Sequence, residues 1–230
     1  MSIGEELTEK LAYKVSFYIP LGDFNIPVPQ SVVVTWGVMA FLVIVSIIFT
    51  RNMKIVPGKR QAFIEFCIEK LYNIFYDILG ERGKRYIPYL LTVLLYLGIS
   101  NMLGLFGIAP PTKDLNTTAG LALMSIILIQ YAGIHQRGVG GWLKHFGHPI
   151  AMMAPMNILE LIIRPLSLCM RLFGNILGAY IIMELVHIVA PAVVPLAAGA
   201  YFDIFDALLQ AYVFCFLTSL FIQESIMDDD

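Results

Sequence analysis

The stretch Glu160-Leu-Ile-Ile-Arg-Pro-Leu-Ser-Leu-Cys-Met-Arg-Leu-Phe-Gly-Asn175 lies in the longest apolar region of the chain, yet it contains two arginines. An α-helix repeats every 3.6 residues, so residues spaced by three or four share one of its faces. That spacing joins a set of polar and small residues here, namely Glu160, Arg164, Ser167, Arg171, Asn175 and Gly178. A charge at the centre of a bilayer costs at least about 2.5–3.5 kcal/mol. Arg171 is therefore a candidate functional residue.

The overall composition is typical of a membrane protein. Hydrophobic residues make up 58% of the 230 positions and charged residues only 14%, with a mean hydropathy of +0.77. Soluble domains contain about 25% charged residues. The net charge of -2 gives no basis for a nucleic-acid partner. Cys67, Cys169 and Cys215 are scattered through apolar helical patterns, which argues against a disulfide framework and against a metal site. The polar, acidic residues 1–10 are not typical of a cleaved signal peptide.

Apolar runs of about 18 residues or more predict membrane-spanning helices. We expect an all-α integral membrane protein with a single domain, 1–230, and five transmembrane helices. The expected spans are 31–50, 86–109, 119–136, and a long C-terminal hairpin over 153–190 and 196–226 that is separated by Pro191 and Pro195. Both hairpin helices exceed the length of one perpendicular span, so strong tilt is expected. Residues 1–30 are expected to form a partly irregular external segment, and 136–148 a glycine-rich loop.

Residues 58–80 differ from the spans because charged and apolar positions alternate at helical spacing. The pattern predicts an amphipathic helix in the membrane interface. The alternative is a soluble-like helix packed on other subunits. A basic cluster precedes it, consisting of Arg51, Lys54, Lys59 and Arg60. The positive-inside rule places this cluster in the cytoplasm. The N-terminus is then outside and the C-terminus is cytoplasmic.

Arg171 has no acidic residue within four positions on its own helix. Its partner must therefore come from another helix, another subunit or water. Gly174 and Gly178 make the helix thin beside it, which allows another surface to approach closely. An arginine remains charged at any accessible pH. That property suits an electrostatic barrier or a transient partner for a carboxylate.

Because the two helices of the hairpin are antiparallel, their polar residues are predicted to fall into two zones. The outer zone holds Glu184, His187, Asp203 and Asp206, and the inner zone holds Asn157, Glu160, Ser167 and Glu224. Gln210 is expected near the depth of Arg171. Buried ionisable groups at membrane depth usually line water or an ion path. Two zones separated by a fixed positive charge cannot conduct a cation straight through, so a carrier would have to take ions past Arg171.

Simpler explanations exist for several of these residues. Glu160 and Arg164 are four positions apart and are expected to form an ion pair that is either structural or functional. His187 could be an interfacial residue, and the outer carboxylates could lie at a loop edge in water. His145 and His148 have no partner ligands for a metal in their glycine-rich loop.

The run Arg164–Asn175 resembles the signature of subunit a of F-type ATP synthases. Pro155–Glu160 and Leu209–Phe214 fit the same family, as does the order of the expected elements. The resemblance implies an ion-translocating stator subunit without catalytic activity or cofactor. It implies a proton or Na+ as the coupling ion, and a rotating ring of c subunits whose carboxylates carry it. The other implied partners are the b-subunit peripheral stalk, the remainder of the ATP synthase and the lipid of a prokaryotic plasma (inner) membrane.

The resemblance also implies roles for individual residues. Arg171 matches the family's arginine between two aqueous half-channels, and Asn175 and Gln210 match polar positions close to it. Ser167 and Glu160 match positions of the cytoplasmic half-channel.

This sequence departs from the family's relay positions. Tyr180 stands where some members have a glutamate, and Asp203 stands where some have a histidine. We therefore expect the external relay to use Asp203 with Glu184 or Asp206.

Two other functional classes have sequence patterns of their own. A stand-alone secondary transporter would usually show an internal repeat and broken midplane helices. A membrane zinc protease would carry H-E-x-x-H. Neither pattern is present in the sequence.

Overall fold

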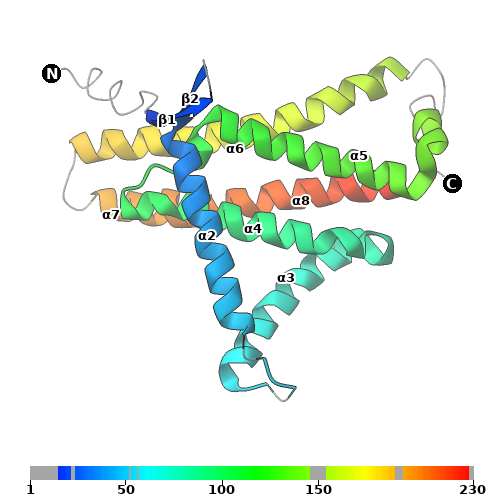
Figure 1. Ribbon diagram of the computed structural model, residues 1–230, viewed down its shortest axis with the longest axis horizontal. Helices are drawn as coiled ribbons and strands as arrows, with labels where there is room; N and C mark the ends of the chain where they lie inside the picture. Colours follow the sequence, from blue (N-terminus) through cyan, green and yellow to red (C-terminus); the bar gives the residue numbers. More distant parts are fainter. Residues whose placement is uncertain are drawn as a thin grey trace. The chain divides into compact units, whose positions relative to one another are not determined.

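The computed structural model describes residues 15–21, 24–51, 53–55, 57–145, 154–189 and 194–227 (Figure 1). Within these residues, five helical stretches are long and apolar enough to cross a membrane: Gln30–Thr50, Lys59–Phe106, Leu115–Gln136, Leu159–His187 and Ala200–Ile226. The predicted class, an all-α integral membrane protein, is confirmed. The chain divides into two compact units: residues 1–46, 96–118 and 172–211, and residues 47–95, 119–171 and 212–230.

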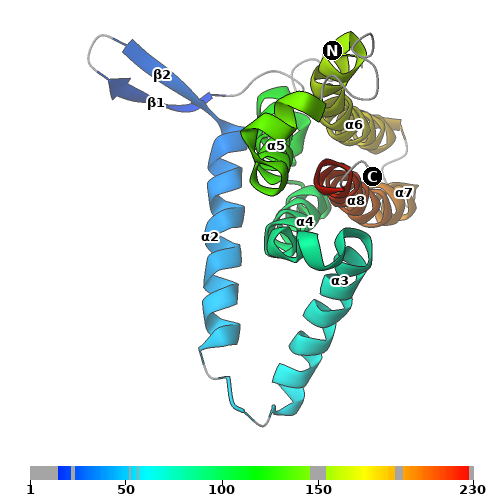
Figure 2. The ribbon, with the colours of Figure 1, turned by 90° about the vertical axis from the view of Figure 1, so that its right-hand side faces the viewer.

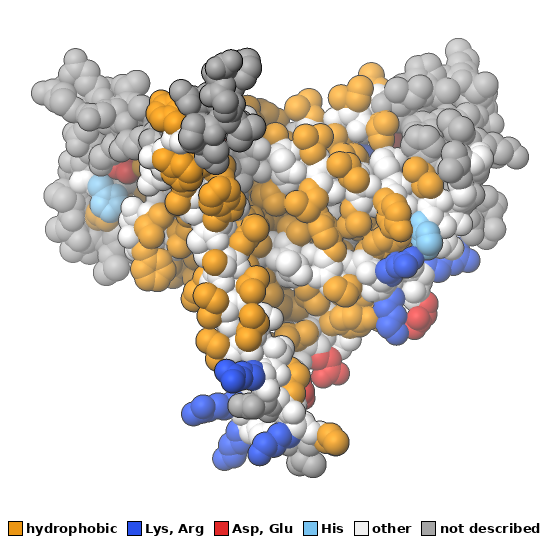
Figure 3. Space-filling view, in the orientation of Figure 1, with side chains coloured by type: hydrophobic (Ala, Val, Ile, Leu, Met, Phe, Trp, Pro, Cys, Tyr) orange, Lys and Arg blue, Asp and Glu red, His pale blue; other side chains and the backbone are white. Residues whose placement is uncertain are grey.

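The first described element is a β-hairpin, in a segment that the sequence suggested to be partly irregular. Strand β1 (Val15–Leu21) pairs antiparallel with β2 (Phe24–Pro29), with Ile19 opposite Ile26. Helix α2 (Gln30–Thr50) follows directly, as Figure 2 shows. Val38 is its only buried residue among those described. Figure 3 shows hydrophobic side chains over the visible face of α2, as expected for a lipid-facing helix.

The middle of the chain contains three further helices with short connections. Helix α3 (Lys59–Gly83) has a break at Gly80, whose φ of 62° is a conformation that favours glycine. A 3-10 turn (Lys84–Tyr86) leads into α4 (Ile87–Met102), and a second 3-10 turn (Leu103–Phe106) ends it. Helix α5 (Leu115–His145) is interrupted at Gly138. Residues 139–145 are helical, so the prediction of a glycine-rich loop was wrong for them.

Two long helical stretches complete the described chain. Helix α6 (Ala154–Val189) runs for 36 residues and continues through Pro165. The second stretch comprises α7 (Val194–Gly199), a π-helical segment (Ala200–Asp206) and α8 (Ala207–Ile226). The change to π-helical geometry between α7 and α8 was not predicted. The expected break at Pro191 lies outside the described residues.

Each unit has its own apolar core. In the unit that contains the hairpin, the buried side chains include Leu97, Leu172, Ile176 and Ala211. In the other unit they include Phe75, Leu90, Ile129, Leu168, Phe214 and Ile222. In both units the second half of the chain supplies part of the core, so the polar residues of α6 and α8 are held by packed helices.

Candidate functional site

A pair of amide side chains joins α6 to the start of α8. Asn175 Nδ2 donates a hydrogen bond to Gln210 Oε1 at 2.6 Å. Gln210 is only 1% exposed, and its own Nε2 has no hydrogen-bond partner among the described residues. A buried amide donor without a partner costs free energy. The carboxamide oxygen of Gln210 thus accepts one hydrogen bond, while its amide nitrogen has no partner among the described residues.

Arg171 lies four residues before Asn175 on α6. Its side chain is exposed, and in the part of the chain that the structure describes it forms no ion pair. The exposed Met170 precedes it and the buried Leu172 follows it. The guanidinium is therefore presented at the surface of the chain, with packed residues of α6 behind it.

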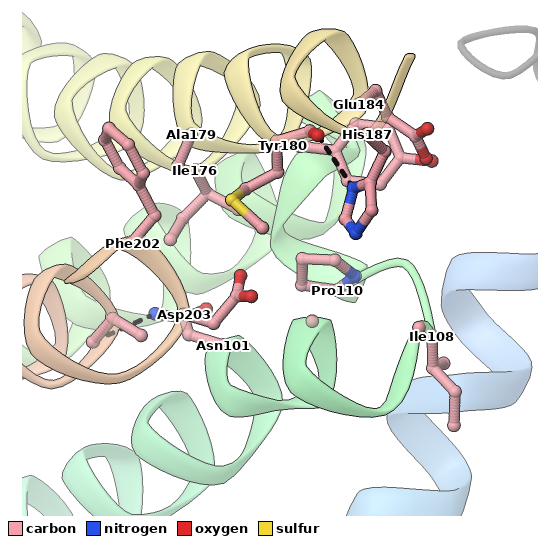
Figure 4. Close-up of a pocket in the computed structure, with 14 residues that line it drawn as sticks. Asn101, Ile108, Pro110, Ile176, Ala179, Tyr180, Glu184, His187, Phe202 and Asp203 are labelled. Carbon is pink, nitrogen blue, oxygen red and sulfur yellow. Dashed lines mark hydrogen bonds between the residues drawn. The ribbon is translucent and has the colours of Figure 1, made fainter. Parts of the chain in front are cut away.

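A cavity of about 90 Å³ lies in the unit that contains Asn175 and Gln210. That volume is enough for several water molecules. Four of its lining residues carry ionisable or hydroxyl groups, namely Tyr180, Glu184, His187 and Asp203. In Figure 4 the carboxylate of Asp203 and the ring of His187 face the same space, from the π-helical segment and from α6 respectively. The cavity is therefore lined by two acidic residues and a histidine, of which Asp203 and His187 face the same space.

The carboxylate of Asp203 packs closely against backbone. A Cβ atom added to Gly104 would lie 2.6 Å from Asp203 Oδ1, and one added to Gly199 would lie 3.4 Å from Oδ2. Real Cβ atoms do not approach to 2.6 Å, so only glycine at position 104 accommodates this carboxylate position. An alanine at position 104 would therefore force the Asp203 carboxylate to move.

His187 has a defined tautomer in this arrangement. Its Nδ1 lies 2.8 Å from the carbonyl oxygen of Met183. Since a carbonyl can only accept, Nδ1 carries a proton and donates it in this hydrogen bond, and Nε2 is not used in it. His187 is exposed, so its ring is accessible from outside the cavity.

The loop after α4 covers one side of the cavity. Lys113 Nζ stands 4.3 Å from the centre of the Tyr180 ring, within cation–π range. Thr112 Oγ1 donates to Asn101 Oδ1 at 2.7 Å, and Asn101 Nδ2 reaches the carbonyl of Ala207 at 3.5 Å. Asn101 is 3% exposed. It therefore ties the loop, α4 and the first residue of α8 together around the cavity.

The second polar cluster lies in the other unit and is centred on Arg164. One guanidinium nitrogen, Nη2, is 2.8 Å from Glu160 Oε2 and 2.6 Å from Glu224 Oε1. The guanidinium also lies 5.1 Å from the centre of the Phe221 ring. The predicted ion pair of Glu160 with Arg164 is confirmed, and Glu224 joins it from α8. Ser167 is exposed one turn further along α6.

Because Arg164 has two carboxylate partners, we expect the loss of either one to be partly compensated. Glu160→Gln or Glu224→Gln alone should lower the free energy of unfolding by less than about 1 kcal/mol, as for partly exposed ion pairs. The double variant should lower the free energy of unfolding by more than the sum of the two single variants, because Arg164 then has no carboxylate partner left. Thermal unfolding of the unchanged chain, the two single variants and the double variant checks this. Strictly additive losses of stability would contradict the sharing of Arg164 by the two glutamates.

The structure groups the predicted site residues into three sets. Asp203, Glu184 and His187 line the cavity, Asn175 and Gln210 form the amide pair, and Glu160 and Glu224 share Arg164. Asp206 is partly buried in the π-helical segment but does not line the cavity. Sequence reasoning did not identify Asn101, Thr112 or Gly104 as parts of the site. Asn101 was noticeable as an amide in an apolar span, but its partners are distant in sequence.

Comparisons with known proteins identify the family. The family model described as ATP synthase A chain matches residues 32–223. ATP synthase subunit a, sodium ion specific, from Propionigenium modestum is 34% identical and aligns with 94% of this chain and 85% of its own length. ATP synthase subunit a of Geotalea daltonii is 37% identical over 86% of this chain and 87% of its own. That of Moorella thermoacetica is 33% identical over 86% and 90%. With a family model over most of its length and such relatives, this chain belongs to the ATP synthase subunit a family.

Proposed function

We propose that the chain is the ion-translocating, non-catalytic subunit of an F-type ATP synthase, and that Arg171 separates two aqueous half-channels. The observation that carries the proposal is the exposed arginine on an apolar helix, with a polar cluster in each of the two units. An exposed charge on a membrane helix is expensive unless a partner or water meets it. The family of the chain supports a rotating c ring as that partner.

The cavity around Asp203 supports an ion path on the outer side of Arg171. Carboxylates line cation pathways because they attract the ion and can also accept a proton. We infer that Asp203 and Glu184 hold the entering ion and that His187 receives it from solvent. Asp206 is left out of this path because it does not line the cavity.

Glu160, Ser167 and Glu224 are proposed to belong to the cytoplasmic half-channel. Two of the three share Arg164, which neutralises part of their charge. A cation that leaves towards the cytoplasm would otherwise be held by two free carboxylates. In this proposal Arg164 therefore does more than pair with the two glutamates, because it also weakens ion binding in the cytoplasmic half-channel.

The proposed cycle depends on the cost of charge in lipid. An ion from one half-channel neutralises a ring carboxylate, and the neutral group rotates through the bilayer. On its return it meets Arg171, which favours the ionised form and displaces the ion into the other half-channel. The Asn175–Gln210 pair would keep the adjacent face of α6 fixed during this exchange. Each elementary charge that crosses 100 mV releases about 2.3 kcal/mol, so several ions per ATP suffice.

The proposal includes a location and partners. The chain would lie in a prokaryotic plasma (inner) membrane with its N-terminus outside, as the basic residues between α2 and α3 support. Its partners would be the c ring, the b-subunit stalk and the rest of the synthase. The coupling ion would be a proton or Na+, and the sodium-specific relative supports Na+ as one of the two candidates. ATP hydrolysis by the complex, measured against Na+ concentration at fixed pH, distinguishes the two ions.

Gly104→Ala is expected to slow ion-driven ATP synthesis about tenfold, because the added methyl displaces the Asp203 carboxylate from the cavity. The pH or Na+ dependence of the rate should shift as well, which a merely structural defect would not produce. Gly120→Ala is the matched control, since its Cβ would meet nothing within 4 Å. Equal rates in the two variants would contradict the positioning role of Gly104.

Purification of the assembled complex tests the proposed function. An affinity tag on this chain should recover a c ring and the catalytic sector in fixed amounts. A functional homo-oligomer of this chain without a ring would instead indicate a stand-alone secondary transporter.

A further inference from the structure

Among the described residues, the first half of α3 and the turn before it bury no side chain in the protein. In the described part of residues 51–74, every side chain is exposed or only partly covered, and burial begins at Phe75. Phe63 is 68% exposed and Phe66 56%. In the preceding turn, Met53 is 51% exposed and Ile55 fully so. Large apolar side chains gain nothing by facing water, so this stretch must be covered by something outside the chain.

The exposed apolar residues of α3 share one helical face with cations. Spacings of three and four residues join the members of this face, which we term the basic face: Lys59, Phe63, Phe66, Cys67, Lys70 and Ile74. Arg60 lies three residues before Phe63 and flanks the same face. Lys70 Nζ stands 5.6 Å from the centre of the Phe66 ring, which shows that cation and aromatic ring are side by side. Charge and apolar surface are thus combined on the basic face.

The acidic residues of this part of α3 lie on another face. Gln61, Glu65 and Glu69 follow one another at intervals of four, and they are displaced by two residues from Lys59, Phe63 and Cys67. Gln61 Nε2 donates to Glu65 Oε1 at 2.8 Å, which holds that carboxylate on its own face. The basic face and the acidic face therefore present separate surfaces.

The turn between α2 and α3 adds two further cations in a fixed conformation. The Gln61 side chain accepts from the backbone nitrogen of Lys54 and donates to its carbonyl oxygen, both at 3.0 Å. Arg51 and Lys54 are exposed in this turn, and no acidic residue occurs between Arg51 and Gln61. Among the described residues, no ion pair involves these cations. Figure 3 shows blue side chains gathered where α2 leads into α3.

We propose that the basic face of α3 and the turn before it bind the headgroups of anionic phospholipids. Phe63, Phe66 and Ile55 enter the boundary between headgroups and acyl chains, and Lys54, Lys59 and Arg60 contact lipid phosphates. The argument for lipid is that the stretch directly follows a membrane-spanning helix and combines apolar anchors with unpaired cations. A neutral lipid surface would satisfy the apolar residues but leave the cluster of cations without countercharge. The site is independent of the proposed ion path.

The test uses a single tryptophan within the basic face. The full-length chain with Trp36→Phe, Trp142→Phe and Phe66→Trp is reconstituted into phosphatidylcholine vesicles that contain either brominated phosphatidylglycerol or brominated phosphatidylcholine. Bromine quenches tryptophan fluorescence on contact, so the two quenching curves give a relative association constant. One cation near an anionic surface contributes about a fivefold preference. We expect the reporter to favour phosphatidylglycerol at least about fivefold, and less at about 1 M salt.

Two variants identify the groups responsible. Lys54→Gln with Lys59→Gln and Arg60→Gln should reduce the preference to about one. Lys54→Arg with Lys59→Arg and Arg60→Lys keeps the charges and should retain it. No preference in the reporter protein, or an unchanged preference in the glutamine variant, would overturn the proposal.

Discussion

Arg171→Ala is expected to abolish ion-driven ATP synthesis, with a loss of at least about 100-fold. The reason is the cost of an unpaired carboxylate at membrane depth, which is about 3 kcal/mol or more and corresponds to that factor in rate. In the proposed cycle, the variant would lack the positive charge that favours release of the ion from a returning ring carboxyl beside α6. The two proposed half-channels would also lose the charge between them, so a passive ion leak is compatible with the loss of synthesis.

The control for this variant is Met170→Ala. Met170 is the preceding residue on α6 and is also exposed, so its truncation alters the same helix surface without removing a charge. Both variants are compared at equal amounts of assembled complex. Coupled synthesis at the normal rate in the Arg171 variant would contradict the proposed role.

Asp203→Asn is the second large effect, and we expect ion translocation to slow by at least about tenfold. A positioned proton-transfer group typically contributes about 100-fold or more. Glu184 and His187 remain in the same cavity and are expected to compensate in part. Asparagine keeps the shape that Gly104 and Gly199 accommodate, so the change removes the charge with little effect on packing. Ion-driven ATP synthesis in vesicles measures the effect.

Two matched carboxylates serve as controls for Asp203. Asp77 lies exposed on α3 and does not line the cavity, so Asp77→Asn should leave translocation nearly unchanged. Asp206→Asn is the sharper comparison, because Asp206 lies in the same π-helical segment but does not line the cavity. Equal effects of Asp203→Asn and Asp77→Asn would remove the assignment of the cavity to the ion path.

The long helices could be predicted because lipid requires apolar runs of sufficient length. Helix α2 begins and ends within one residue of the expected 31–50. The expected range 153–190 includes Pro165, and α6 continues through it because membrane helices tolerate proline when other groups satisfy the freed backbone. The spacing of Glu160 and Arg164 was sufficient to predict their ion pair.

The β-hairpin and the π-helical segment could not be predicted, because local sequence patterns do not reveal the contacts on which they depend. The hairpin of β1 and β2 contains Pro20, Pro27 and Pro29, and proline argues against a strand in any sequence-based prediction. The π-helical segment has no sequence signature. It occurs where the Asp203 carboxylate packs against Gly104, a residue almost 100 positions earlier in the chain. At their spacing, Asp203 and Asp206 would share one face of an α-helix. That expectation could not distinguish Asp203, which lines the cavity, from Asp206, which does not.

The most direct test of the central claim is to measure ion uptake and ATP formation together in vesicles of defined content. We predict no gradient-driven ion movement with this chain alone. Addition of the c ring, stalk and catalytic sector should produce ion uptake and ATP formation in a fixed ratio at every driving force. Ion uptake by the chain alone at the rate of the full complex would contradict the claim that this protein moves ions only as part of an ATP synthase.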